Sequence, residues 1–221
     1  MAAPRTHSGM TLHIGNYTYS SWSLRAWLAL AKTELPFRVN VIDLDVPGYK
    51  ERLHELSRAG TVPVLWVNDD TIPDSLAICE FAARCVPNMW PSDPATRAEC
   101  ERVVRLMHGG FPAIRRECPM NLKRRTEGFV PRDALAEAEE IDGLWQELLG
   151  RHDGAFLFGD WTIADAFYTP VATRFASYGL PRSTRSDTYI SEVMSDEDYL
   201  EWESRAFMED HVIPETDAVN L

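Results

Sequence analysis

The sequence has few cysteines, and none stands in a pattern that carries redox or metal chemistry. No Cys-x-x-Cys pair and no zinc-binding spacing occurs among them, and none of the six histidines stands at ligand spacing from another. We therefore expect structural thiols in a reducing compartment and no bound metal. The four thiols are Cys79, Cys85, Cys100 and Cys118.

Positive charge is also scarce. The chain has 22 Lys and Arg residues against 34 Asp and Glu residues, which gives a formal net charge of -12. Binding of nucleic acid or of an anionic membrane needs basic side chains clustered on one face. The basic run 123–125 is too short to supply such a face, so we expect no nucleic-acid partner and no membrane partner.

Long apolar runs are missing as well. No run approaches the roughly 20 apolar residues of a membrane-spanning helix. Residues 1–9 are small and polar, without the apolar centre of a signal peptide. We expect a cytoplasmic protein in which residues 1–9 are disordered.

The sequence does contain a regular succession of strand and helix patterns up to Val86. It predicts the order strand, helix, strand, helix, strand, strand, helix, and therefore a compact α/β domain over residues 10–86. The predicted strands are 11–15, 37–43, 61–67 and 71–72, and the predicted helices are 21–33, one around 49–56, and 74–86.

Beyond Val86 the patterns are helical. Three prolines mark a linker over 87–94, and an all-helical domain is expected over 95–207. Gly109, Gly110 and Pro112 predict a kink in the first of its helices. Thr162 and Asp165 form a capping-box pattern before an apolar helix. Residues 208–221 are expected to form a mobile acidic tail.

Two serines stand where the first strand becomes a helix, at Ser20 and Ser21. The first backbone N–H groups of a helix have no internal partner and carry a partial positive charge, so an anion such as a thiolate is stabilised there. The alternative is that one of these serines is only an N-cap, which is the commonest reason for serine before a helix.

Four motifs, in order, resemble those of the glutathione S-transferase superfamily. The resemblance covers roughly residues 10–207 and is closest to a bacterial-type branch near the zeta class. It implies a thioredoxin-like α/β N-terminal domain followed by an all-α C-terminal domain. The motifs are Thr18-Tyr19-Ser20-Ser21-Trp22-Ser23-Leu24-Arg25, Val62-Pro63, Asp74-Ser75 and the Thr162-x-x-Asp165 segment.

One segment departs from that branch. Where such sequences carry Pro-Thr-Gly-Lys before Val-Pro, this chain has Arg58-Ala59-Gly60-Thr61. A lysine that could face the glycine end of glutathione is therefore missing.

The resemblance implies glutathione as co-substrate and assigns a set of site residues. Ser20 would donate its hydroxyl to the glutathione thiolate, with Ser21 as the second choice. Val62, joined to Pro63 by a cis bond, would pair with the cysteinyl backbone beside Thr61. The γ-glutamyl end would bind Asp74 and Ser75, and the electrophile would lie against Tyr19, Trp22, Met107, His108, Phe111 and Arg115.

The implied activity is conjugation of glutathione to a hydrophobic electrophile, a detoxification reaction, by a homodimer. One alternative is zeta-like cis-trans isomerisation of a small dicarboxylic acid, for which Arg115, Arg116 or Arg174 could supply positive charge. Another is a binding subunit that has the fold without the chemistry. The fold and the glutathione site leave the physiological electrophile open.

Overall fold

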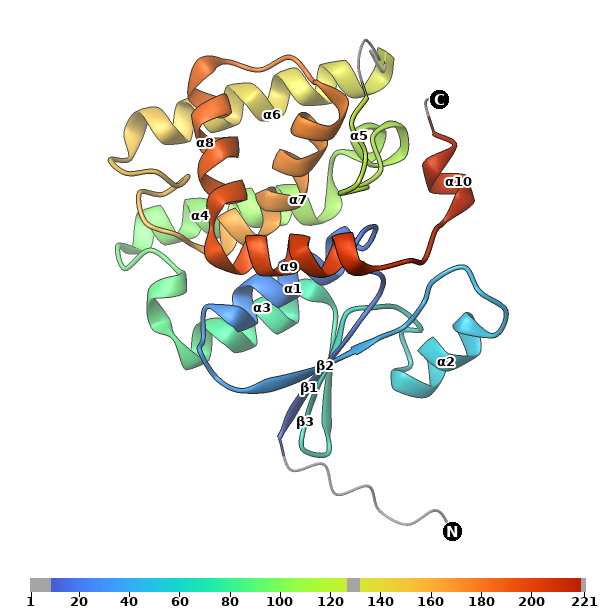
Figure 1. Ribbon diagram of the computed structural model, residues 1–221. Coiled ribbons are helices and arrows are strands. Elements are labelled where there is room, and N and C mark those ends of the chain that lie inside the picture. The colour runs from blue at the N-terminus through green and yellow to red at the C-terminus, as the bar shows by residue number, and fades with distance from the viewer. Residues whose placement is uncertain (1–8, 127–131, 220–221) are drawn as a thin grey trace.

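The computed structural model describes residues 9–126 and 132–219. Of the segment expected to be disordered, residues 1–8 lie outside the described residues. The order of strands and helices up to residue 85 is the predicted one (Figure 1). Its elements are β1 (Met10–Ile14), α1 (Ser21–Ala31), β2 (Phe37–Val41), α2 (Tyr49–Leu56), β3 (Val64–Val67), β4 (Asp70–Pro73) and α3 (Ser75–Cys85).

The four strands form one mixed sheet in the order β2-β1-β3-β4. β1 runs parallel to β2 and antiparallel to β3, and β3 pairs with β4 as an antiparallel hairpin. Helices α1 and α3 lie between the sheet and the helical region, while α2 lies apart from them (Figure 1). This arrangement confirms the predicted thioredoxin-like domain.

Helix α1 is apolar on almost every side. The spacing of Leu24, Trp27 and Leu28 predicts one buried face, and all three are buried. All eight residues from 23 to 30 are buried, because α1 packs on the sheet, on α3 and on the helical domain at once. A helix that is covered all round is typical of a domain centre.

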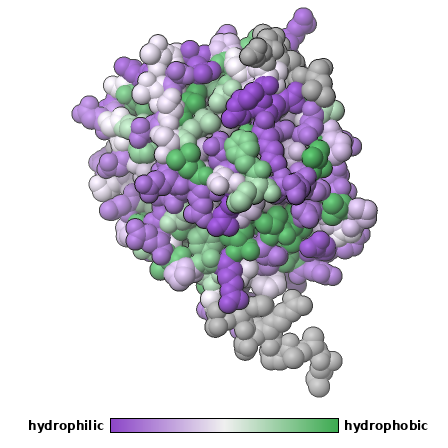
Figure 2. All heavy atoms as spheres, in the orientation of Figure 1, coloured by the Kyte–Doolittle hydropathy of each residue, from purple (hydrophilic) through white to green (hydrophobic). Residues whose placement is uncertain are grey.

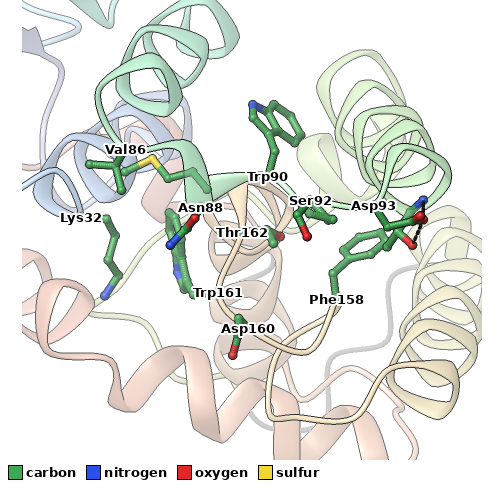
Figure 3. A pocket seen from close by; sticks show the side chains of 13 residues that line it. Lys32, Val86, Asn88, Trp90, Ser92, Asp93, Phe158, Asp160, Trp161 and Thr162 are labelled. Atoms are coloured by element: carbon green, nitrogen blue, oxygen red, sulfur yellow. Dashed lines mark hydrogen bonds between the residues drawn. The ribbon is translucent and has the colours of Figure 1, made fainter.

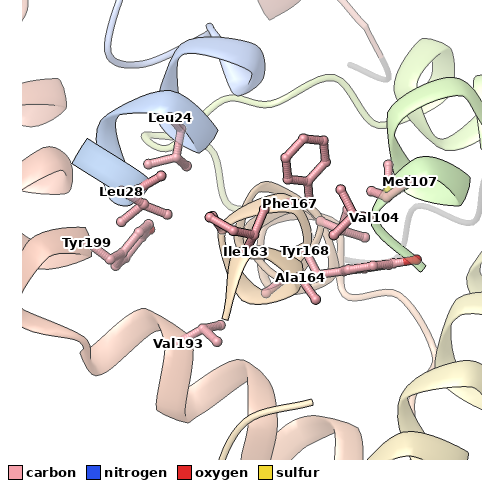
Figure 4. Packing of buried hydrophobic residues seen from close by; sticks show 14 of the residues in the cluster. Leu24, Leu28, Val104, Met107, Ile163, Ala164, Phe167, Tyr168, Val193 and Tyr199 are labelled. Atoms are coloured by element: carbon pink, nitrogen blue, oxygen red, sulfur yellow. The ribbon is translucent and has the colours of Figure 1, made fainter. Parts of the chain in front are cut away.

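The C-terminal region is helical and is centred on α7. Ile163 and Phe167 of this helix are fully buried, as predicted, and they pack against side chains of α1 and α4 (Figure 4). Its elements are the 3-10 turn η1 (Pro87–Met89), α4 (Pro94–Gly109), α5 (Pro112–Glu117), α6 (Arg132–Arg151), α7 (Ile163–Tyr178), α8 (Thr184–Ser195), α9 (Glu197–Met208) and α10 (Pro214–Asp217).

The predicted kink between residues 109 and 112 is a complete break between two helices. Helix α4 ends at Gly109, and Phe111 adopts the left-handed conformation with φ 57°. Pro112 then occupies the first turn of α5, where its missing N–H costs no hydrogen bond. The polypeptide therefore changes direction here rather than bending within one helix.

The segment expected to be a mobile tail is anchored to the N-terminal domain over its described part. It includes the short helix α10, and Asp217 accepts hydrogen bonds from Tyr19 and Asn121. Glu209 accepts bonds from the backbone of Tyr17 and Thr18. The acidic side chains that suggested a solvated tail are instead acceptors for these donors.

The surface mixes hydrophilic residues with smaller groups of hydrophobic ones (Figure 2). Among the exposed large apolar side chains, Leu200, Phe207 and Met208 belong to α9. Within the described ranges, no helix combines the length and the apolar character needed to cross a bilayer.

Candidate active site

Three loop segments meet at one end of the sheet. Val64 of β3 pairs with His13 near the end of β1 and also with Pro73 at the end of β4. The residues that follow β1, precede β3 and follow β4 are therefore neighbours in space. These segments are 20–21, 62–63 and 74–75, the three places where the sequence predicts contacts with glutathione.

The Ser20 hydroxyl belongs to a chain of hydrogen bonds at the start of α1. Ser20 Oγ lies 2.7 Å from Ser23 Oγ, and Ser23 Oγ accepts from the backbone N–H of Gly15 at 3.1 Å. When Ser23 donates to Ser20, the Ser20 proton is free to donate to an incoming anion. Hydrogen bonds linked in this way polarise one another.

Neither serine acts as a side-chain cap for α1. Ser20 occupies the N-cap position but makes no capping hydrogen bond with its side chain. The Ser21 hydroxyl makes no hydrogen bond within the described part of the chain, although the residue is only 6% exposed. Capping of the helix therefore does not account for either hydroxyl. The positive end of the helix dipole remains available for an anion.

The bond between Val62 and Pro63 is cis, as the sequence resemblance implies. Pro63 is buried, Val62 is half-buried and Thr61 is exposed. No backbone hydrogen bond involves Val62 within the described ranges. Its N–H and C=O groups are thus free to pair with an extended peptide.

Asp74 and Ser75 start α3. The Asp74 carboxylate caps the helix by accepting from Leu76 N at 2.8 Å and from Ala77 N at 3.3 Å. Asp74 has φ 80°, which is uncommon for a residue other than glycine. The Ser75 hydroxyl is buried without a hydrogen-bond partner, so this helix start has an unused donor.

Three of the residues predicted to contact the electrophile come together near that helix start. His108 Nε2 lies 3.4 Å from Asp74 Oδ2, and the His108 ring meets the edge of Trp22 with centroids 5.2 Å apart. The Arg115 guanidinium lies 5.0 Å from the Trp22 ring. Burial lowers the pKa of His108, so its neutral form is favoured at neutral pH.

The other three predicted residues are placed differently. The Tyr19 hydroxyl donates to Asp217 at 3.0 Å and therefore belongs to the contact with α10. Met107 is fully buried in the core around α7 (Figure 4), and Phe111 is only 4% exposed at the break between α4 and α5. Met107 and Phe111 therefore pack in the core, whereas Tyr19 is half-buried.

Sequence patterns missed Arg25, which lies beside this cluster. Its guanidinium is fully buried between the rings of Trp22 and Phe167, at 4.5 and 4.7 Å, and none of its nitrogens has a hydrogen-bond partner. Burial lowers its pKa strongly, and the charges of Arg115 and Arg174 lower it further. A buried cation among other cations, without a hydrogen-bond acceptor for its guanidinium in the part of the chain that the structure describes, favours an anionic ligand.

A separate cavity of about 760 Å³ lies at the opposite end of α1 (Figure 3). Lys32, just past the end of that helix, lines it together with the linker and the loop before α7. An 11-residue helix is about 16 Å long, so this cavity is remote from Ser20. No residue predicted to bind glutathione or the electrophile lines it.

The four cysteines and the other possible metal ligands are spread over the described part of the chain. It contains no group of three or more His, Cys, Asp or Glu side chains arranged to hold a metal ion. The thiols at positions 79, 100 and 118 are buried, and burial raises the pKa of each. They are poor nucleophiles in this state.

Comparison with known proteins agrees with the geometry. Residues 19–85 match the family model described as Glutathione S-transferase, N-terminal domain. The probable maleylacetoacetate isomerase of Caenorhabditis elegans is 31% identical over 169 residues, 72% of this chain and 78% of that protein. The maleylacetoacetate isomerase of Rattus norvegicus is 31% identical over 104 residues, 45% of this chain and 48% of that protein.

Solved structures show the same fold. A glutathione transferase homologue from Burkholderia gl BGR1, with bound glutathione, superposes with a TM-score of 0.72 at 20% identity over 91% of this chain and 100% of that one. Poplar glutathione transferase F1 gives a TM-score of 0.71 at 17% identity over 92% of this chain and 100% of that one. Together with the sequence relatives, they show that this chain belongs to the glutathione S-transferase superfamily, near the zeta class.

Proposed function

We propose that the protein is a glutathione transferase in which Ser20 holds the glutathione thiol as a thiolate for attack on a hydrophobic electrophile. The observation that carries this proposal is the hydrogen-bond chain from Gly15 through Ser23 to Ser20 at the start of α1. It ends on a hydroxyl that is not used as a cap. We further propose that the enzyme acts as a cytoplasmic homodimer.

Glutathione would bind along the end of the sheet. The γ-glutamyl carboxylate would accept from the Ser75 hydroxyl and from the first backbone N–H groups of α3, which is a favourable place for an anion. The carboxylate of Asp74 would attract the ammonium group. The unpaired backbone of Val62 would exchange hydrogen bonds with the cysteinyl residue.

Bound in this way, the thiol would lie at the start of α1. A free thiol has a pKa of about 8.5 and is mostly protonated at neutral pH. A hydrogen bond from Ser20 and the helix dipole both stabilise the charged form, and both lower the thiol pKa. The thiolate then attacks the electrophilic carbon and forms a thioether as the leaving group departs.

The direct test is retention on immobilised glutathione, followed by an assay of conjugation to an aryl halide. We expect retention and turnover. We also expect Ser75→Ala to raise KM for glutathione by about 10- to 150-fold, because a hydrogen bond to a charged group contributes about 1.5 to 3 kcal/mol. The kcat should change little, since the γ-glutamyl end is remote from the reacting sulfur.

Ser177→Ala is a matched control, because Ser177 is also a buried serine but lies in α7. It should leave KM for glutathione unchanged. If the wild-type protein is neither retained nor active, the proposal is wrong and a non-catalytic subunit with this fold is favoured. If Ser75→Ala leaves KM unchanged, the placement of the γ-glutamyl end is wrong.

A second candidate function is cis-trans isomerisation of a small dicarboxylic acid, which Arg25 favours. The relatives from Caenorhabditis elegans and Rattus norvegicus carry the name maleylacetoacetate isomerase. In such a reaction the thiolate would add to the cis double bond, the new single bond would rotate, and loss of the thiolate would regenerate glutathione. A carboxylate of the substrate would pair with Arg25, whose guanidinium has no hydrogen-bond partner within the described residues.

Arg25→Met tests this second function. With a cis-dicarboxylic substrate we expect a loss of about 100-fold in kcat/KM, because one side of a charge-assisted pair is removed. Conjugation of an uncharged aryl halide should be retained. The Met side chain fills a similar space between Trp22 and Phe167, and removal of an unpaired buried charge should not lower the melting temperature.

Arg25→Lys is the companion variant, because it keeps the charge but loses the planar group that stacks between the two rings. Partial recovery of isomerisation would support a charge interaction with the substrate. Equal loss of both activities in Arg25→Met would show that Arg25 only supports the fold, and the second function would then lose its basis.

A further inference from the structure

The loop that carries the candidate catalytic serine is held by the C-terminal segment of the chain. Glu209, the residue after α9, accepts from Tyr17 N at 3.0 Å and from Thr18 N at 2.9 Å, one through each carboxylate oxygen. Asn16 Nδ2 adds a weaker contact to the same carboxylate at 3.4 Å. One charged side chain thus accepts hydrogen bonds from two successive backbone N–H groups.

Other contacts join the same two segments. Trp202 Nε1 donates to the backbone oxygen of Tyr17 at 3.0 Å, and Thr18 Oγ1 donates to Ala206 O at 3.3 Å. Asp217 accepts from the Tyr19 hydroxyl at 3.0 Å. Every residue from 16 to 19 therefore has a hydrogen-bond partner in the segment 202–217, near the other end of the sequence.

One short turn connects the residues bound by Glu209 to Ser20. The backbone N–H of Ser20 donates to Asn16 O at 2.9 Å, and that of Tyr19 donates to the same oxygen at 3.3 Å. Asn16 is fixed in turn by bonds to Asp43 and to the backbone of Leu44. Residues 17 and 18 lie inside this turn, so we expect a shift of their backbone to move Ser20 relative to the sheet end.

We propose that Glu209 is a positioning residue for thiol activation, which holds the loop 16–19 so that the Ser20 hydroxyl points at the sulfur. This inference rests on the function proposed above. Glu209 is half-exposed and follows a helix end, so its side chain contributes charge-assisted hydrogen bonds rather than core packing. A displacement of about 1 Å in a catalytic group can cost about 100-fold in rate.

The test is Glu209→Gln, which keeps the shape but replaces one accepting oxygen by an NH₂ group that faces a backbone N–H. We expect hydrogen exchange at residues 17 and 18 to become faster. We expect kcat for conjugation to fall by about 10- to 100-fold and the pKa of the bound glutathione thiol to rise towards its free value. KM for glutathione should stay unchanged, because its other proposed contacts lie just before β3 and at the start of α3.

Glu203→Gln is the matched control. Glu203 is an acidic residue of α9 that accepts from Tyr199 and does not contact the loop. It should alter neither exchange at residues 17 and 18 nor the thiol pKa. Glu209→Asp, which keeps the charge on a shorter side chain, should recover part of kcat.

Each remaining outcome decides against the proposal. Unchanged hydrogen exchange at residues 17 and 18 in Glu209→Gln would show that the hydrogen bonds to Glu209 do not hold the loop. Faster exchange with an unchanged thiol pKa would show that these hydrogen bonds stabilise the loop without affecting thiol activation. If Ser20→Ala has no effect in an otherwise active enzyme, the proposed function fails, and the role of Glu209 in thiol activation fails with it while the exchange result stands by itself.

Discussion

Ser20→Ala is expected to lower kcat for glutathione conjugation by about 100-fold, the loss typical of removing one hydrogen-bond donor from a catalytic anion. Without this donor the thiolate keeps only the helix dipole, and the pKa of the bound thiol should return towards about 8.5. The rate should then rise with pH over a range in which the wild-type rate is already constant. Stopped-flow or steady-state rates across pH measure both effects.

Two neighbouring variants make this test specific. Ser23→Ala leaves the Ser20 donor in place but removes the group that polarises it, so we expect a smaller effect of about 1 kcal/mol, or roughly five-fold. Ser21→Ala should have little effect, because no hydrogen bond connects Ser21 to the chain from Gly15 within the described residues.

The reverse ranking is an equally clear result. If Ser21→Ala produces the large loss and Ser20→Ala does not, the activating hydroxyl is Ser21 and the hydrogen-bond chain is only structural. If none of these variants alters the rate or the pH profile, thiol activation by a serine is wrong. A crystal structure with glutathione in which the sulfur lies far from residues 20–22 would lead to the same conclusion.

The features that the sequence predicted correctly depend mostly on neighbours in the chain. The strand and helix order follows from local periodicity, and the capping box at Thr162 and Asp165 spans only four residues. The cis bond at Val62-Pro63 came from the family resemblance rather than from spacing. Residues 58–61 differ from the sequence that the family branch usually carries before Val-Pro, and nothing in the described part of the chain explains this difference.

The features that the sequence missed depend on distant partners. Tyr19 stands beside the serines, but its hydroxyl contacts Asp217, which is 198 residues away. Arg25 occupies an ordinary position in α1, and its burial depends on Phe167 of another helix. The tail was expected to be mobile because it is acidic. Its local sequence does not show that its carboxylates accept hydrogen bonds from the backbone of the loop 16–19.

The fold itself should depend strongly on Asp165. This fully buried carboxylate accepts from the backbone N–H groups of Thr162 at 2.8 Å and Leu157 at 3.1 Å, and from the hydroxyl of Tyr189 at 3.1 Å. Asp165→Ala leaves these buried donors without an acceptor. We expect a loss of about 3 to 5 kcal/mol in the free energy of unfolding.

Urea titration of the two proteins measures this loss. Asp160→Ala is the matched control, because Asp160 lies in the loop just before α7 but is exposed. It should change the free energy of unfolding by less than about 0.5 kcal/mol. An equal loss in both variants would show that the loop, and not the buried carboxylate, is responsible.

The pH dependence of the Asp165 contribution has a defined sign. Burial raises the pKa of Asp165 from 3.8 to about 6, against the effect of its hydrogen bonds. Between these two pH values the folded protein binds more protons at this site than the unfolded chain, so this group's contribution to stability is complete below pH 3.8 and falls as pH rises towards 6.

Asp165→Asn isolates this effect, because asparagine does not titrate. The cost of the substitution should be larger at pH 5 than at pH 7.5, by roughly 1 kcal/mol. Urea titrations of wild type and variant at both pH values give this difference, and effects of other titrating groups cancel between the two proteins. A cost that is constant with pH, or that grows as pH rises, would mean that Asp165 is already ionised in the folded protein at pH 5, and that its hydrogen bonds outweigh its burial.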